Sequence, residues 1–435
     1  MTSETFIYHH SERGRQMYII PGYVKTTEKD DAVFLSSEIL HNEVKISQPE
    51  LKQELHSLSE NGCSDLSTPL TKFLHEQELL ENEEEAKQKI MSYQEFLNHY
   101  LMLTIMPTEG CNFRCPYCYE THQGIVMNDK TFDGIKQYVK EKIESGFQVV
   151  RINWFGGEPT LCKQKILDMG RLIHSLCQTN KVSYYSEMTT NGYLLDVDSF
   201  REYYDSGVRA YQITLDGWNH DKTRPHVSGK GTLDTILNNL KEISKLPKEQ
   251  YQYHIMIRYN ILPDCDDFTW YDYLKELFGK DERFGVLIRP VFDWGGDSVK
   301  ELSLIQERDM DKKVEEHLEY LEKIGLKTVN GHRTGVYSKI CAAAYPYGFV
   351  FRANGKIEKC TVCLDHPKNC VGYVDEKKGV ILDNKTNKLW SASSIEPKCL
   401  KCPSVLSCLN RGCKRKEITE GITENDCSYI LSKTY

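Results

Sequence analysis

The sequence has 435 residues and contains no run of about 18 apolar residues, so we expect no membrane-spanning helix. The N-terminal segment, MTSETFIYHHSERGRQ, lacks the apolar stretch of a secretory signal. Positive charge is not in excess either, because 55 basic residues face 63 acidic ones, for a formal net charge of −8. This balance argues against nucleic-acid and membrane partners. We expect the chain to stay in the reducing cytoplasm.

Cysteine, by contrast, is abundant, with 16 residues in the chain. Disulfides are not expected in a large protein of a reducing compartment. Three of the thiols form one short group, Cys111–Cys118, and a second group lies between Cys341 and Cys427. Such clustering favours metal binding, whereas the scattered thiols are expected to be buried and apolar in character: Cys63, Cys162, Cys177 and Cys265.

From about residue 100, strand-like apolar segments alternate with amphipathic helices. The predicted strands are Leu101–Met106, Val149–Phe155, Val182–Met188, Ala210–Leu215, Tyr253–Ile261 and Val286–Val291. The helices between them include Lys130–Ser145, Lys163–Cys177 and Leu233–Ser244. Six such units predict an α/β fold with a parallel sheet, either an open barrel or a doubly wound sheet. In both, chemistry gathers at the carboxyl ends of the strands.

The flanking regions differ from this pattern. Near the N-terminus we predict strands Met17–Val24 and Ala32–Ile39, joined by a polar turn, Lys25–Asp31. Helices at Pro49–Ser59 and Pro69–Leu80 follow, the second with Leu70, Phe73 and Leu80 on one face. Together these elements suggest a small winged-helix module. The run Glu81–Ala86 is either a linker or a solvated helix face. After a helix at Lys312–Ile324, short turn-rich segments suggest a small domain held together by metal.

The motif Cys111-Asn-Phe-Arg-Cys115-Pro-Tyr-Cys118 directly follows the first predicted strand of the sheet. Three thiolates in one short loop can bind three corners of a cubane 4Fe–4S cluster and leave the fourth iron open to a substrate. A zinc site remains an alternative, although zinc usually takes paired CxxC motifs. A chance group of buried thiols is the other alternative.

Polar motifs follow the next two strands. Gly156, Gly157 and Glu158 end the second strand. Glycines allow close approach of the backbone to a ligand, and the Glu158 carboxylate can accept hydrogen bonds from an ammonium. Thr190 and Asn191 end the third strand and offer a hydroxyl and an amide to a ligand. Each motif is also compatible with a simple tight turn.

Two charged residues occupy the later strands. Asp216 ends the fourth strand and is either structural or in contact with the site. Arg258 lies inside an otherwise apolar strand, where a buried guanidinium needs a partner. That partner is either a ligand carboxylate or a structural salt bridge.

The CxxxCxxC motif after a first strand, with Tyr117 before the third cysteine, resembles the radical S-adenosylmethionine (SAM) superfamily. The resemblance implies a partial (β/α)6 TIM-like barrel and a cluster on Cys111, Cys115 and Cys118 whose open iron chelates SAM. One electron then cleaves SAM to a 5′-deoxyadenosyl radical, which abstracts hydrogen from the substrate. The GGEP segment matches the family motif that holds the methionine amino group, and Thr190 and Asn191 are implied ligand contacts.

The C-terminal cysteines resemble the SPASM pattern, C–G–x4–C followed by CxxCx5CxxxC and a last cysteine. The last gap of the quartet, between Cys408 and Cys413, holds four residues instead of three, which leaves the role of Cys413 open. The resemblance implies two auxiliary 4Fe–4S clusters. The outer one would use Cys399, Cys402, Cys408 and Cys427, and the inner one Cys341, Cys360 and Cys413. Cys363 or its rival Cys370 would complete the inner cluster, which otherwise has an open iron; zinc is the competing metal.

A winged-helix module before such a barrel resembles ribosomal-peptide (RiPP) maturases. The domains would be a recognition element (1–95), a radical SAM barrel (96–310), and a linker helix with a SPASM domain (311–435). The resemblance implies a precursor peptide bound through its leader, a thioether or other crosslink as product, and a flavodoxin- or ferredoxin-type reductant. Sulfatase-maturase-like oxidation, small-molecule radical chemistry and a non-catalytic iron–sulfur or zinc protein are the alternatives.

Overall fold

The protein is described by a computed structural model that covers residues 17–296, 298–329, 341–391, 395–408 and 414–421. The chain divides into two compact units. One contains residues 1–95 together with 393–410, and the other contains residues 96–392 together with 411–435. The division into three functional domains stays a prediction.

The larger unit is built on a parallel sheet, as predicted. Its strands are β6 (Tyr100–Ile105), β7 (Val149–Trp154), β8 (Ser183–Thr190), β9 (Val208–Thr214), β10 (His254–Ile261) and β11 (Phe284–Pro290). They lie in sequence order, each parallel to its neighbours. All six predicted strands are confirmed, each end lying within two residues of the predicted one. The fold is the mostly parallel α/β sheet of a partial TIM-like barrel.

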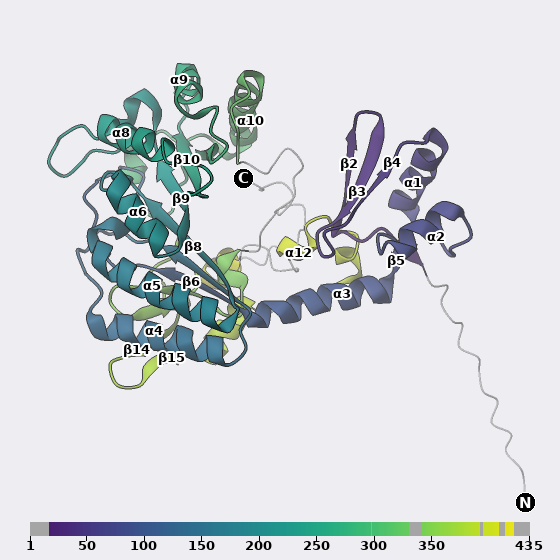
Figure 1. Cartoon of the computed structure of the whole chain (residues 1–435), viewed down its shortest axis with the longest axis horizontal. Helices are drawn as coiled ribbons and strands as arrows, with labels where there is room; N and C mark the ends of the chain where they lie inside the picture. Colours follow the sequence, from purple (N-terminus) through teal and green to yellow (C-terminus); the bar gives the residue numbers. More distant parts are fainter. Residues whose placement is uncertain (1–16, 297, 330–340, 392–394, 409–413, 422–435) are drawn as a thin grey trace, which may run out of the picture. The chain divides into compact units, whose positions relative to one another are not determined.

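Helices connect these strands and cover one face of the sheet (Figure 1). Alternation explains the arrangement, because Leu101, Leu103 and Ile105 of β6 are fully buried on one face, while the other face carries Tyr100, Met102 and Thr104. The helices are α4 (Asp129–Glu144), α5 (Lys163–Asn180), α6 (Val197–Asp205), α7 (His220–Thr223), α8 (Leu233–Ser244), α9 (Thr269–Phe278) and α10 (Glu307–Ile324).

The cysteine-rich region extends this sheet. Strand β12 (Gly348–Phe351) pairs in parallel with β6, and β13 (Lys356–Glu358), β14 (Cys370–Asp375) and β15 (Gly379–Leu382) follow in antiparallel order. The result is one ten-stranded sheet. Helix α11 (Asn384–Ser391) comes next, with α12 (Val405–Cys408) in the smaller unit and a π-helical turn at Lys416–Glu420. Sequence patterns gave no sign that β12 joins the barrel sheet.

The smaller unit holds an antiparallel sheet of β2 (Val24–Lys29), β3 (Ala32–Ser37) and β4 (Glu43–Ile46). Its helices are α1 (Pro49–Asn61), α2 (Pro69–Glu76) and the first turns of α3 (Glu83–Phe96); β1 (Tyr18–Ile19) pairs with β5 (Glu81–Asn82). The predicted strand Met17–Val24 and turn Lys25–Asp31 are therefore wrong. Strand β2 escaped prediction because its side chains from Thr26 to Lys29 are all exposed and show no apolar alternation.

Of the two interpretations of Glu81–Ala86, the linker is wrong, because Glu81 and Asn82 form β5 and α3 begins at Glu83. The solvated helix face is confirmed for Glu83 and Glu84, which are exposed in the first turn of α3. Glu81 is buried, where it accepts a hydrogen bond from the Tyr23 hydroxyl and pairs with Lys89. Helix α2 ends at Glu76 instead of Leu80, and Phe73 is 42% exposed, so it does not share the buried face of Leu70.

Two expectations about the whole chain can be compared with the described residues. No helix among them is long and apolar enough to cross a membrane. All fourteen described cysteines are free. Of the four scattered thiols, only Cys177 is fully buried, whereas the other three are partly exposed: Cys63, Cys162 and Cys265.

The buried Tyr23–Glu81 contact gives a stability prediction. Tyr23→Phe removes the hydroxyl that donates to a buried carboxylate, and should lower the free energy of unfolding by about 1–3 kcal/mol. Urea unfolding followed by circular dichroism measures the change. Lys87→Ala, on the exposed face of α3, is the control and should stay within about 0.5 kcal/mol of the wild type. Equal effects of the two variants would contradict the assignment.

Candidate functional site

A cavity of about 450 Å³ lies at the carboxyl ends of the barrel strands. It brings together the three cysteines of the CxxxCxxC motif and every residue predicted to bind the cofactor. Those residues are Cys111, Cys115, Cys118, Tyr117, Gly156, Gly157, Glu158, Thr190, Asn191 and Arg258. Asp216 does not line this cavity and borders a neighbouring one instead.

The three thiols are partly to deeply buried. Burial raises the pKa of Cys111 and of Cys118 to about 12, and it also raises the pKa of Cys115. At neutral pH these groups are therefore neutral thiols unless a positive charge compensates the thiolates. Metal ions supply such a charge, and three thiols on one cavity wall are a suitable donor set for iron or zinc. In the described part of the chain, no three potential ligands converge on a single-ion site.

The Gly156-Gly157 turn packs on the backbone that leads to Cys111. Gly156 has φ 113°, and a Cβ on it would lie 2.3 Å from the carbonyl oxygen of Thr108. A Cβ on Gly157 would lie 2.3 Å from the carbonyl oxygen of Gly110. The amide of Gly157 also donates to Thr108 O at 3.2 Å. The glycines are thus needed so that two backbone segments of the site can pack against each other, in addition to any contact with a ligand.

Glu158 is almost completely buried, and its carboxylate joins two strand ends. Oε1 accepts hydrogen bonds from the amide of Thr160 at 3.0 Å, from its hydroxyl at 2.5 Å and from the Thr190 hydroxyl at 2.6 Å. Oε2 accepts from the amide of Asn191 at 2.7 Å. Most of its acceptor capacity is therefore occupied by the protein, and Oε2 alone keeps a free position for an ammonium.

Asn191 ties the third strand to the cysteine loop. Its side-chain amide donates to Asn112 Oδ1 at 2.7 Å, and its own Oδ1 accepts from the amide of Tyr193 at 3.0 Å. Asn112 directly follows Cys111, so Asn191 fixes the start of the cysteine loop. Thr190 and Asn191 consequently organise the wall of the cavity through contacts that sequence alone could not assign.

Asp216 lies behind this wall. Its carboxylate accepts hydrogen bonds from the hydroxyl of Tyr117 and from that of Thr223, the latter at 3.0 Å. Arg224 in turn donates to the Tyr117 hydroxyl at 3.0 Å. This buried set holds the ring between Cys115 and Cys118 in place. The structure therefore favours the structural alternative for Asp216.

Arg258 projects from β10 into the cavity. Its Nε donates to Asn260 Oδ1 at 2.8 Å, and no carboxylate within the described ranges forms an ion pair with it. Burial lowers the pKa of Arg258, although nearby Tyr117, Tyr119 and Asp216 oppose that shift. The structural salt bridge considered for this residue is absent from the described part of the protein. A buried guanidinium facing a cavity is a suitable partner for a ligand carboxylate.

Sequence reasoning missed part of the cavity wall. Tyr119 and Glu120 follow the cysteine loop, and burial raises the pKa of Glu120 to about 7. Their position next to Cys118 was the available signal. Thr361 and Val362 also line the cavity, although they lie about 240 residues from the cysteine loop. No local pattern marked them, because only the pairing of β12 with β6 brings them there.

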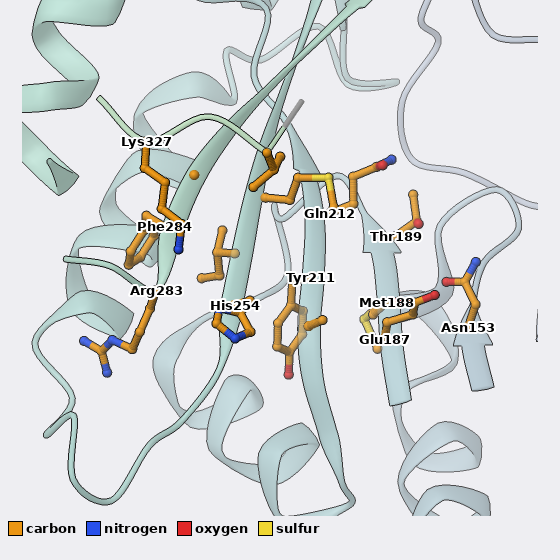
Figure 2. Close-up of a pocket in the computed structure, with 15 residues that line it drawn as sticks. Asn153, Glu187, Met188, Thr189, Tyr211, Gln212, His254, Arg283, Phe284 and Lys327 are labelled. Carbon is orange, nitrogen blue, oxygen red and sulfur yellow. The ribbon is translucent and has the colours of Figure 1, made fainter. Parts of the chain in front are cut away.

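A second cavity, of about 250 Å³, continues into the barrel lumen (Figure 2). It shares Asn153, Thr189 and Gln212 with the first cavity. The three residues lie on the neighbouring strands β7, β8 and β9 and line both cavities. The two cavities together therefore extend from the cysteine loop toward the amino ends of the strands.

The C-terminal cysteines are divided between the two units. In the larger unit, the thiols of Cys360 and Cys363 are hydrogen-bonded, the Cys370 thiol donates to Gly372 O at 3.4 Å, and Cys341 is exposed. The smaller unit contains Cys399, Cys402 and Cys408. Cys413 and Cys427 lie outside the described residues. Cys363 thus contacts Cys360, and the choice between Cys363 and Cys370 as a cluster ligand stays a prediction.

A family model supports the resemblance. Residues 105–266 match that of the Radical SAM superfamily, a range that includes the cysteine triplet, the glycine turn and Arg258. The GTP 3′,8-cyclase of Clostridium perfringens is 34% identical over 143 residues, 32% of this chain and 42% of that enzyme. The same enzyme of Tolumonas auensis is 30% identical over 151 residues, 34% and 41% of the two chains. The chain thus spans less than half the length of these relatives.

A solved structure with a TM-score above 0.5 shares the fold. The structure of anSMEcpe with bound AdoMet and Cp18Cys peptide has a TM-score of 0.54 and 18% identity, and covers 77% of this chain and 94% of that chain. Streptococcus suis SuiB bound to precursor peptide SuiA has a TM-score of 0.47 and 14% identity, with 90% and 94% coverage.

The packing of Gly157 gives a prediction for the site. Gly157→Ala places a methyl group against Gly110 O and should displace the start of the cysteine loop. We expect less iron bound per chain after anaerobic reconstitution, measured by a colorimetric iron assay. Ser183→Ala, at the exposed amino end of β8, is the matched control and should bind iron like the wild type. Full iron content in the Gly157 variant would show that the loop tolerates the methyl group.

Proposed function

The chain carries a radical SAM domain, and on this premise we propose that it is a radical SAM peptide maturase. A 4Fe–4S cluster on Cys111, Cys115 and Cys118, once bound, supplies the electron that cleaves SAM to methionine and the hydrogen-abstracting 5′-deoxyadenosyl radical. The substrate is a residue of a precursor peptide, and the product is a thioether or other crosslink. A flavodoxin- or ferredoxin-type protein of the cytoplasm is the proposed reductant.

One observation carries the proposal: the three thiols share a single cavity with the polar ends of four strands. The cavity lies at the carboxyl edge of a parallel sheet, where such folds place their chemistry. Its size falls within the usual range for small-molecule sites, which is compatible with a nucleoside-sized ligand.

Residues of the chain have separate roles in this proposal. Arg258 binds a carboxylate, since its guanidinium faces the cavity without an ion-pair partner among the described residues. The free position on Glu158 Oε2 accepts from an ammonium, and Asn191 holds the cysteine loop through Asn112. Together they would orient the methionine part of SAM at both of its charged groups.

The C-terminal cysteines are proposed as ligands of two auxiliary 4Fe–4S clusters. Cys360 and Cys363 carry most support, because their thiols contact each other at the end of β13. With Cys341 and Cys413 they would hold the inner cluster. The outer cluster would use Cys399, Cys402, Cys408 and Cys427.

A peptide substrate is supported by the smaller unit. Both β2 and β4 are edge strands of its sheet within the described part of the chain, so each can accept an added strand. We propose residues 1–95 as a recognition element for the leader. In anSMEcpe, a similar fold is seen with a bound peptide.

A second candidate is oxidation of a cysteine or serine as in sulfatase maturation, the alternative that the resemblance to SPASM enzymes leaves open. Similarity to GTP 3′,8-cyclases keeps small-molecule radical chemistry as a further alternative. A short sulfatase-type peptide, GTP and the precursor peptide, tested side by side, distinguish the three.

The cluster assignment is tested on the reconstituted protein. The wild type should bind about 12 iron atoms if it holds three cubanes. When dithionite is added as reductant, it should form 5′-deoxyadenosine from SAM. A Cys111→Ala, Cys115→Ala, Cys118→Ala triple variant should bind about 8 and form none. Cys177→Ala, which removes a buried thiol on α5, should match the wild type. Zinc in place of iron, with no 5′-deoxyadenosine, would support a non-catalytic scaffold.

Leader recognition is tested at the sheet edges. Ser37 N donates to Asn42 O, so by antiparallel alternation the Lys45 amide on β4 points away from β3. Lys45→Pro removes that donor and should weaken leader binding about tenfold, as measured by fluorescence anisotropy with the leader of a neighbouring precursor gene. Lys45→Ala is the matched control, and Glu28→Pro tests the β2 edge. Unchanged affinity in both proline variants would contradict recognition by strand addition.

A further inference from the structure

The sequence Glu-x-Cys occurs at two places that the fold brings together. Glu109-Gly110-Cys111 leads into the cysteine loop, and Glu358-Lys359-Cys360 leads into the Cys360–Cys363 loop. Between the two carboxylates lies a single side chain, Arg352. It follows β12, the strand that pairs with β6, and precedes the turn into β13.

Arg352 contacts both carboxylates at once. Its Nε and Nη2 donate to the two oxygens of Glu109 at 2.8 and 2.7 Å, a parallel two-bond pair. Its Nη1 donates to Glu358 Oε2 at 3.3 Å, and Nη2 also lies 3.4 Å from Asp365 Oδ2. The exposed fractions of Arg352, Glu109 and Glu358 are 1%, 2% and 0%. Only a planar guanidinium can make these contacts in three directions.

Glu358 passes this connection on to the Cys360–Cys363 loop. Its Oε1 accepts from the amide of Asp365 at 3.1 Å. Asn369, which is fully buried, accepts from the amide of Cys360 at 2.9 Å and donates to Cys363 O at 3.0 Å. Both ends of the loop are therefore held from the side on which Glu358 lies.

The middle of this loop lines the cavity of about 450 Å³ at the carboxyl ends of the barrel strands. Thr361 and Val362 line it together with Cys111, Cys115 and Cys118. The separation of the two cysteine loops thus sets the width of the cavity between them. Any shift of Arg352 would change the positions of both loops together.

We infer that Arg352 is a positioning residue that locks the Cys360–Cys363 loop against the Cys111–Cys118 loop through Glu109 and Glu358. It fixes the cavity wall opposite the triplet, and with it the distance between the two groups of thiols. The contacts of Arg352 carry this lock, whereas its consequence for auxiliary clusters rests on the proposed function.

The lock is tested on the full-length, metal-free chain by hydrogen–deuterium exchange with mass spectrometry. In Arg352→Gln, exchange should rise roughly tenfold in both segments, 108–113 and 358–365, and less elsewhere. Arg352→Lys keeps the charge and should restore part of the protection. Unchanged exchange in either segment, or an equal rise throughout the chain, would overturn the inference.

Two further variants keep this test decisive. Arg283→Lys alters another buried arginine, which is labelled in Figure 2, and should leave both segments unchanged. Arg283 pairs with Asp281 just before β11. If Arg352→Gln does not fold, Glu358→Gln decides. It keeps the side-chain shape, weakens one arm of the contact, and should speed exchange in 358–365 but not in 108–113. No change in 358–365 would refute the lock.

The effect of Arg352 on the proposed auxiliary clusters is tested on the reconstituted protein. If wild-type iron and electron paramagnetic resonance (EPR) spectra match only one cluster, the auxiliary-cluster proposal fails while the exchange result still stands. If a Cys360→Ala variant removes a second EPR signal, Arg352→Lys should keep its iron but alter that signal. The same variant should also lower product formed per 5′-deoxyadenosine. An unchanged signal and ratio would show that Arg352 does not position the second site.

Discussion

The close approach of two backbone segments is the constraint on which the candidate site depends. Gly156 and Gly157 lie so near Thr108 and Gly110 that neither could carry a side chain without displacement. This contact joins the end of β7 to the segment that leads from β6 into the cysteine loop. Glu158, next in sequence, extends the connection to β8 through Thr190 and Asn191. The thiols are thus positioned by neighbouring strands as well as by their own loop.

Buried charge is the second organising feature. Arg352 and the buried carboxylates of Glu109 and Glu358 satisfy one another. Arg258 differs, since its guanidinium faces the cavity with only an amide oxygen as hydrogen-bond partner in the described residues. A buried cation without a counter-ion is costly in the free protein and favours an anionic ligand. Burial also raises the pKa of Cys111 and Cys118, so their thiolates require a compensating positive charge.

The parallel pairing of β12 with β6 links the C-terminal region to the barrel. Because of this pairing, Thr361 and Val362 of the Cys360–Cys363 loop line the same cavity as the cysteine triplet. The loop is therefore not confined to a separate domain held together by metal. Backbone pairing and Arg352 hold this hairpin against the sheet.

The sequence by itself determined the six strands of the barrel, the order of the motifs at their ends and the group of residues around the cysteine triplet. These follow from local patterns: apolar periodicity, turn residues and cysteine spacing. It misjudged β2 and the Glu81–Ala86 segment, because an exposed edge strand carries no apolar alternation and a buried glutamate looks like a solvated one. Only the tertiary structure decided the partners of Arg352, the occupied acceptors of Glu158, the place of Asp216 behind the wall and the entry of Thr361 into the cavity. Each of these depends on contacts between segments far apart in sequence, which local physical preferences do not encode.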